Sequence, residues 1–141
     1  MPERVAILLV EDNDDDAELT SLALASPSLA YRLQRVRDGA EAFDVLSGSA
    51  TRAEETLRPL PVVVLLDLRL PKVSGLELLE AIRANERTRA LPVIVLSNSA
   101  WDRERLEERQ LGPIAFVGKP VQRASLAAAA ASLGLRLWSE A

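Results

Sequence analysis

Five polar side chains that can do chemistry stand at the ends of short apolar runs in this 141-residue sequence: Glu11, Asp12, Asp67, Ser97 and Lys119. The sequence contains no histidine and no cysteine. These absences exclude relays that use a histidine base, and they exclude imidazole and thiolate metal ligands. Carboxylates, hydroxyls and ammonium groups remain, and these groups bind hard cations and phosphate.

The apolar runs before these residues predict strands. Residues 5–10, 62–66 and 93–96 are short, continuous and rich in β-branched residues, as in parallel strands that are covered on both faces. Residues 31–36 alternate more and predict an edge strand. Residues 114–117 predict the last strand and the other edge.

Helical periodicity appears between the strands. Residues 75–82 carry apolar side chains at positions i, i+3, i+4 and i+7, and residues 42–46 and 126–133 repeat this spacing. About five strands alternating with about five helices predict a doubly wound α/β sheet with right-handed crossovers and no domain boundary. In such a sheet, ligands bind beyond the carboxyl ends of the strands, so the polar strand ends are expected to converge.

Two segments differ from the other elements. Residues 102–110 hold one apolar side chain, Leu106, among charges, which predicts a helix that is thinly attached to the core and able to move. We expect Asp102 to cap this helix and Trp101 to pack onto Leu106. Residues 47–58 lack a periodic apolar face and predict a helix end followed by a long exposed loop.

Convergence of the strand ends brings Glu11, Asp12 and Asp67 into one small space. Carboxylates at such short range raise one another's pKa unless a cation joins them. Mg²⁺ is the best candidate, since it takes one or two carboxylates together with waters and phosphate oxygens. Ser97 and Lys119 add a hydroxyl and an ammonium group, which suit a phosphoryl group.

The residues at these positions carry a family resemblance. The runs ILLVEDN at 7–13, LLDLRLPKVSG at 65–75, VIVLSNS at 93–99 and FVGKPV at 116–121 resemble the receiver domain of bacterial two-component response regulators. The resemblance implies a flavodoxin-like five-stranded parallel sheet of order 2-1-3-4-5 with helices on both faces. It also implies that Asp67 takes a phosphoryl group from the phosphohistidine of a partner histidine kinase and forms an acyl phosphate.

The same resemblance implies a metal site. Asp12, Asp67 and the backbone carbonyl of Arg69 would bind Mg²⁺, with Glu11 acting through water. The domain would be a phosphoacceptor with self-catalysed dephosphorylation rather than an enzyme that turns over a separate substrate.

A phosphoryl-binding pair and a switch follow from the family pattern as well. Ser97 and Lys119 would hold the phosphoryl oxygens, and Phe116 occupies the place of the family's rotating aromatic residue. We expect Ser97 to move toward the phosphoryl group, Phe116 to fill the vacated space and the helix at 102–110 to repack.

A narrower resemblance concerns the stand-alone regulators that partner phytochrome-type histidine kinases. It is carried by VEDNDDDAELT at 10–20, VRDGAEAFDVL at 36–46 and KPV at 119–121. It implies that residues 1–141 form a single receiver domain without an output domain, which acts through protein contacts. Arg69 departs from that subgroup, where asparagine is usual, and this puts the lifetime of the acyl phosphate in question.

The end of the chain offers an apolar surface. Gly134 is expected to end the last helix, and a tail at 133–141 follows. Its apolar side chains either fold back over the same domain or cover a second copy, and we favour a homodimer through the last helix and this tail. The candidate dimer residues are Leu133, Leu135, Leu137 and Trp138.

Composition limits the partners and the location. A formal net charge of −4 argues against direct binding to nucleic acid, which requires a basic surface. The sequence has no apolar run near the ~20 residues of a membrane span, and its first residues lack the pattern of a secretory signal. We therefore expect no membrane partner and a cytoplasmic location.

Each candidate residue also has a purely structural interpretation. The acidic run 11–16 is typical of a solvated helix start, and Asp67, Ser97 or Ser99 could cap a turn or helix. Lys119 before a proline could be an exposed turn. Taken together, these interpretations require the polar strand ends to coincide by chance.

Three other functions compete with the receiver interpretation. A Mg²⁺-dependent phosphatase with an aspartyl nucleophile, of the haloacid dehalogenase kind, would place its nucleophile after the first strand and a second aspartate where Arg69 stands. A nucleotide- or flavin-binding module would need a GxGxxG or GxxxxGK loop, which the sequence lacks. A scaffold domain that accepts no phosphate would not need the complete set of site residues.

Overall fold

Strands and helices alternate along the chain. The computed structural model describes residues 6–48, 57, 59–70, 74–109 and 111–139. The elements within these ranges are β1 (Ala6–Val10), α1 (Asp14–Leu24), β2 (Arg32–Val36), α2 (Gly39–Ser47), β3 (Val63–Asp67), α3 (Gly75–Ala84), β4 (Val93–Leu96), α4 (Ala100–Glu108), β5 (Ile114–Val117) and α5 (Arg123–Ser132).

The five strands form one parallel sheet in the order β2-β1-β3-β4-β5, as expected. β1, β3 and β4 are buried along their whole length, which explains why their sequences are continuously apolar. β2 and β5 are the edges, and both show interrupted burial. β3 includes Asp67, so this carboxylate belongs to the strand rather than to the turn after it.

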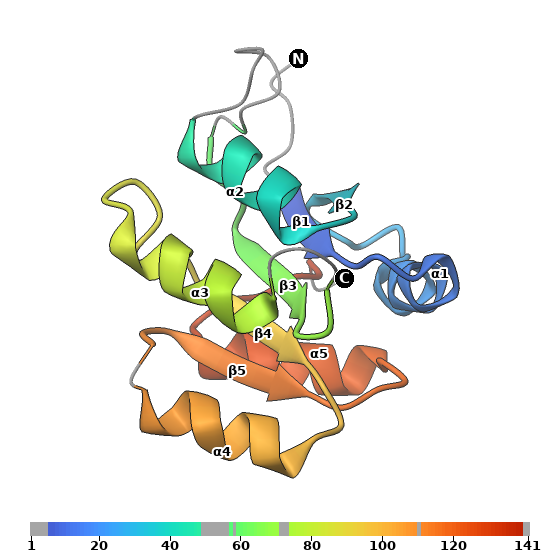
Figure 1. Ribbon diagram of the computed structural model, residues 1–141. Coiled ribbons are helices and arrows are strands. Elements are labelled where there is room, and N and C mark those ends of the chain that lie inside the picture. Colours follow the sequence, from blue (N-terminus) through green and yellow to red (C-terminus); the bar gives the residue numbers. More distant parts are fainter. Residues whose placement is uncertain (1–5, 49–56, 58, 71–73, 110, 140–141) are drawn as a thin grey trace.

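Alternating side chains of the central strands pack into two separate hydrophobic cores, one on each face of the sheet. Ile7 and Leu9 of β1 point into the core that α1 and α5 cover. Leu8 and Val10 point into the core that α2, α3 and α4 cover. Figure 1 shows the resulting three layers, with α2 and α3 in front of the sheet and α5 behind it.

Polar side chains fix where the helices begin. Asn13 caps α1, and Ser74 caps α3 in a reciprocal capping box with Glu77. α4 begins one turn earlier than expected, because the Ser99 side chain accepts a hydrogen bond from the backbone N–H of Asp102. The expectation that Asp102 caps this helix is therefore wrong.

The expected packing of Trp101 onto Leu106 is also wrong. Leu106 is buried, whereas 63% of the Trp101 surface is exposed. The Trp101 ring lies under the guanidinium of Arg105 instead, 4.5 Å from its centroid. Leu106 is the single buried side chain of α4, so the thin attachment of this helix is confirmed.

The tail after α5 folds back over its own domain. Gly134 has a φ of +77°, the left-handed conformation expected at a helix end. Trp138 donates its indole N–H to the Leu24 carbonyl at 3.0 Å and pairs with Leu29 in an antiparallel bridge. Leu137 and Trp138 keep only 1% and 7% of their surfaces exposed, so these two candidate dimer residues offer little surface to a second copy.

The other two candidate dimer residues lie beside this tail. Leu133 and Leu135 are half-buried and pack against the core under α1 and α5. Of the expected long loop, residues 49–56 and 58 lie outside the described ranges, as does Val5 of the first predicted strand. Leu57 is 5% exposed, so the loop is not exposed at this residue.

Within the described ranges, no helix is both long and apolar enough to span a bilayer. The cytoplasmic location stays a prediction.

Candidate functional site

The carboxyl ends of β1 and β3 bring three acidic side chains together. Glu11 and Asp12 follow β1, and Asp67 ends β3 next to it in the sheet. One carboxylate oxygen of each residue lies within 4.8 Å of the others. Glu11 and Asp67 are buried, whereas Asp12 is exposed at the mouth of the site.

The donor set fits a hard divalent cation. All three residues offer oxygen ligands, the exposed Asp12 leaves room for waters, and one ammonium group carries less charge than three ionised carboxylates.

Lys119 contacts this cluster from the loop after β5, across the end of β4, which separates β5 from β3 in the sheet. Its Nζ donates to Glu11 Oε1 at 3.1 Å, Asp16 Oδ2 at 3.0 Å and Asp67 Oδ2 at 3.0 Å. Its backbone N–H donates to Asn98 Oδ1 at 2.7 Å, which ties the β5–α5 loop to the end of β4. One ammonium group thus joins carboxylates from three segments.

The pKa values of Glu11 and Lys119 are shifted from the values that these side chains have in water. Burial, followed by the hydrogen bond and charge of Asp67, raises the pKa of Glu11 to about 7, and Lys119 opposes this shift. Burial lowers the pKa of Lys119, but hydrogen bonds to Asp16, Asp67 and Glu11 outweigh it and hold the pKa above its ordinary value. Lys119 therefore stays charged at neutral pH.

The two carboxylate oxygens of Asp67 have different partners. Oδ2 accepts from Lys119, and Oδ1 accepts from the backbone N–H of Arg69 at 2.9 Å. The side chain is therefore held by a cation on one side and by its own loop on the other. The role of the Arg69 carbonyl as a metal ligand stays a prediction.

A cavity of about 490 Å³ opens in front of these groups. Its lining combines the expected site residues with their neighbours: Asp12, Asn13, Asp16, Asp67, Arg69, Leu96, Ser97, Asn98, Ser99 and Lys119. The structure thus brings Asp12, Asp67, Ser97 and Lys119 to one opening, with Glu11 buried behind it. This space can admit a phosphoryl group.

Ser97 connects this cavity to α4. Its Oγ accepts from the backbone N–H of Ser99 at 3.1 Å and donates to Asp102 Oδ2 at 3.5 Å. Movement of the Ser97 hydroxyl toward the cavity would therefore alter contacts at the start of α4.

Phe116 lies on the neighbouring strand β5 and is half-buried. Phe116 and Ser97 line one cavity of about 260 Å³. The guanidinium of Arg103, from α4, covers the Phe116 ring at 5.0 Å from its centroid. This aromatic side chain is thus in contact with the helix that is expected to repack.

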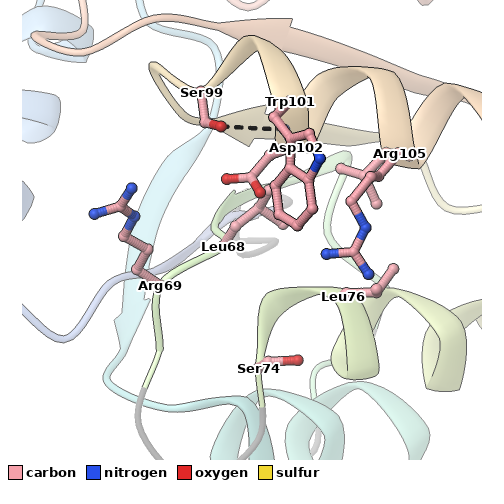
Figure 2. A pocket seen from close by; sticks show the side chains of 9 residues that line it. Leu68, Arg69, Ser74, Leu76, Ser99, Trp101, Asp102 and Arg105 are labelled. Atoms are coloured by element: carbon pink, nitrogen blue, oxygen red, sulfur yellow. Dashed lines mark hydrogen bonds between the residues drawn. The ribbon is translucent and has the colours of Figure 1, made fainter.

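A further pocket of about 420 Å³ lies between the β3–α3 loop and α4. Figure 2 shows the guanidinium groups of Arg69 and Arg105 on opposite sides, with Trp101 and Asp102 between them. Arg69 also lines the acidic cavity, so the two spaces share one wall.

Sequence reasoning missed Asp16 and Asn98. The acidic run 11–16 is typical of a solvated helix start, but Asp16 contacts Lys119. Its position in the acidic first turn of α1, directly after the loop that carries Asp12, was the available signal. Asn98 had no comparable signal, because its contact depends on how β4 and β5 are aligned.

Comparison with known proteins agrees with this geometry. The response regulator receiver domain family matches residues 7–131. The chain is 47% identical over 96 residues, 68% of its length, to the probable methanogenesis regulatory protein FilR2 of Methanothrix harundinacea. It is 38% identical over 93 residues, 66% of its length, to response regulator Rcp1 of Synechocystis sp.. These matches span 59% and 61% of the two curated relatives, about three fifths of their length.

Solved structures show the same fold. The bacteriophytochrome response regulator AtBRR superimposes with a TM-score of 0.86 at 40% identity, over 99% of each chain. The Mn²⁺-bound form of Rcp1 superimposes with a TM-score of 0.70 at 30% identity, over 94% of this chain and 91% of that one. This chain therefore belongs to the family of response regulator receiver domains, which are signalling domains, and is homologous to phytochrome response regulators.

Proposed function

We propose that in this receiver domain Asp67 accepts a phosphoryl group from a partner histidine kinase. The observation that carries the proposal is the arrangement around Asp67. Its carboxylate lies at the open end of β3, 3.0 Å from Lys119 Nζ and within 4.8 Å of the Glu11 and Asp12 oxygens. A buried aspartate with only a structural role would not need both the ammonium group of Lys119 and an open cavity beside it.

The proposed reaction transfers a phosphoryl group from a histidine nitrogen of the kinase to an oxygen of Asp67. An Asp67 carboxylate oxygen attacks the phosphorus of a phosphohistidine, a P–O bond forms, and the P–N bond breaks with its electron pair going to the imidazole. Hydrolysis of the acyl phosphate would return the carboxylate and inorganic phosphate. Lys119 is positioned to stabilise the added negative charge, and Ser97 can supply a hydroxyl donor.

The acidic residues provide the metal site for this reaction. Asp12, Asp67 and the Arg69 carbonyl would hold Mg²⁺, with Glu11 acting through water. When bound, Mg²⁺ would neutralise charge on the phosphoryl oxygens. The oxygen-only donor set supports this choice, as does the Mn²⁺-bound form of the relative Rcp1.

Phosphorylation would act through Ser97, Phe116 and α4. Reversing a conformer ratio from 1:99 to 99:1 requires about 5.5 kcal/mol, and charge-assisted hydrogen bonds contribute about 1.5–3 kcal/mol each. About two to four new bonds to the phosphoryl group are therefore enough. The contacts of Ser97 with Asp102 and of Arg103 with Phe116 support a coupling to α4.

A phytochrome-type histidine kinase is the proposed partner. The similarity to AtBRR over nearly the whole of both chains supports this assignment. Reconstitution with a bacteriophytochrome kinase and labelled ATP should transfer label to this chain, whereas a kinase of an unrelated sensor class should transfer it much more slowly.

Intact-mass measurement tests the phosphoacceptor. Incubation with Mg²⁺ and acetyl phosphate should add a single phosphoryl group to the wild type and none to Asp67→Asn, because the amide is not a nucleophile for this reaction. Asp44→Asn, an exchange on α2 away from the cavity, serves as the matched control and should still gain the group. Phosphorylation of Asp67→Asn to the wild-type level would refute the assignment, and sustained turnover of phosphomonoesters would favour a phosphatase.

We also propose a homodimer that uses α5 and the tail. Support comes from the small apolar residues on the exposed side of α5, Ala124, Ala127, Ala128 and Ala131, and from the half-buried Leu133 and Leu135 next to them. Sedimentation at high micromolar concentration should give a dimer, and Ala128→Glu should give a monomer. A monomeric wild type with and without acetyl phosphate would refute this assembly.

A further inference from the structure

The short loop between β1 and α1 carries Asp12, and residues of the neighbouring strand β2 hold the conformation of this loop. The backbone N–H of Glu11 donates to the Val36 carbonyl at 3.1 Å and extends the pairing of β1 with β2. Asn13 then caps α1. Between these two fixed points, the orientation of the Glu11–Asp12 peptide decides where the Asp12 side chain leaves the backbone, since the peptide group is planar.

Arg35, on β2, holds this peptide. Its Nε donates to the Glu11 carbonyl oxygen at 3.0 Å, and its Nη1 donates to Asp14 Oδ1 at 2.9 Å. One rigid guanidinium therefore contacts the loop both before and after Asp12. With its side chain 25% exposed, Arg35 is partly shielded from water, which strengthens charge-assisted hydrogen bonds.

The charges are arranged so that Arg35 does not neutralise the acidic cluster. Its Nε and Nη1 donate to a backbone carbonyl and to the Asp14 carboxylate, and neither acceptor is one of the side-chain carboxylates of Glu11, Asp12 and Asp67. Asp14 also pairs with Arg37 at 2.7 Å, so its own charge is balanced. Arg35 therefore takes none of the three carboxylates of the cluster as a described hydrogen-bond partner.

We propose that Arg35 is a positioning residue for the metal site, which orients Asp12 through the Glu11–Asp12 peptide and thereby sets the affinity for Mg²⁺. This inference rests on the proposed function, because it assumes that Asp12 and Asp67 hold the cation. Outer partners that orient metal ligands typically change metal affinity by 10- to 100-fold when they are removed.

Arg37 provides a matched control. Both arginines pair with Asp14, but the Arg37 side chain is 60% exposed and its described contact is the one with Asp14. Arg37→Met therefore removes the same type of charge near the same carboxylate and leaves the hydrogen bond to the Glu11 carbonyl in place.

Calorimetric titration with MgCl₂ tests the inference. Arg35→Met should raise the dissociation constant of Mg²⁺ about 10-fold or more, and Arg37→Met should change it less than about 2-fold. Arg35→Lys keeps the charge but loses the planar guanidinium with its two fixed donors, so its dissociation constant for Mg²⁺ should lie between those of the two methionine variants. At saturating Mg²⁺, phosphorylation of Arg35→Met by acetyl phosphate should return close to the wild-type rate, because the reacting groups are intact.

Measurements on the metal-free protein separate positioning from general destabilisation. In EDTA at a temperature well below unfolding, Arg35→Met should shift the amide resonances of Asp12 and Asn13 while those of α3 stay unchanged. If Arg35→Met does not fold, Asp14→Asn tests the same clamp from its other end and should also weaken Mg²⁺ binding. Wild-type Mg²⁺ affinity in a folded Arg35→Met would overturn the inference, whereas a wild type that binds no Mg²⁺ would overturn the proposed function itself.

Discussion

At the scale of single residues, Glu11 is the group whose charge state the site controls most. It is fully buried, it contacts Lys119, and its pKa is raised to about 7 from an ordinary value near 4.5. A proton on Glu11 reduces repulsion with Asp67, and a bound cation would favour the ionised form instead.

This shift predicts how stability depends on pH in the absence of metal. Between about pH 4.5 and pH 7 the folded protein keeps a proton on Glu11 that the unfolded chain has released, so the free energy of unfolding should fall as pH rises through this range. Urea titrations in EDTA at several pH values measure the slope.

Glu11→Gln supplies the control, because it cannot ionise and should flatten this part of the profile. Addition of Mg²⁺ to the wild type should reduce the slope as well. An unchanged profile in Glu11→Gln would assign the dependence to another group.

The sequence was sufficient to predict Asp12, Asp67, Ser97 and Lys119 at one opening, because parallel strands must end at the same edge of a sheet. It was insufficient for Asp16, since one contact of a helix side chain depends on the angle at which α1 crosses the sheet. The spacing of residues along the chain does not predict this crossing angle.

At the scale of elements, Arg83 fastens α3 to the α3–β4 loop and to the α4–β5 loop. Its guanidinium donates to the carbonyl oxygens of Leu111, of Arg89 at 3.1 Å, of Leu91 at 2.6 Å and of Pro113 at 3.0 Å. These bonds place the start of β5, and therefore also the strand end that leads to Lys119.

Arg83→Met should lower the free energy of unfolding by roughly 2–4 kcal/mol, because several partly buried carbonyl groups lose a charged donor. Arg109→Met is the comparison variant. Arg109 pairs with Glu80 at 2.9 Å, but both side chains are almost half exposed, so the loss should be about 1 kcal/mol or less. Chemical denaturation of both variants measures the difference, and equal losses would contradict this account.

The strands were predicted to within a residue, since four of them are built on short apolar runs and β2 shows an alternating pattern. The start of α4 was not, because Ser99 and Asp102 are both good capping residues and the sequence alone does not choose between them. The exposed position of Trp101 followed from that shift of one turn.

At the scale of the whole molecule, the tail connects the end of α5 to the α1–β2 segment. Ser139 donates its backbone N–H to the Ser28 carbonyl at 2.6 Å, and Ala30 donates to the Leu137 carbonyl at 2.9 Å. The apolar tail was visible in the sequence, but its two possible destinations, its own domain or a second copy, differ only in long-range packing.

Trp138→Ala should lower the free energy of unfolding by roughly 3–5 kcal/mol, because it leaves a cavity in the core under α1 and α5. Trp101→Ala, at the exposed tryptophan of α4, should cost about 1 kcal/mol or less. Urea denaturation followed by circular dichroism compares them. A loss in Trp138→Ala no larger than in Trp101→Ala would mean that the tail adds nothing to the fold.

The single buried side chain of α4 has a consequence for how quickly the molecule can respond. α3 buries four residues, whereas α4 buries only Leu106 while bordering the charged cavity through Ser99. The free energy needed to open a segment locally is low where few apolar contacts are buried, so a rearrangement of α4 should cost little free energy. We therefore expect that even a short-lived added charge at Asp67 can change the position of α4 and with it the surface that α4 presents to other proteins.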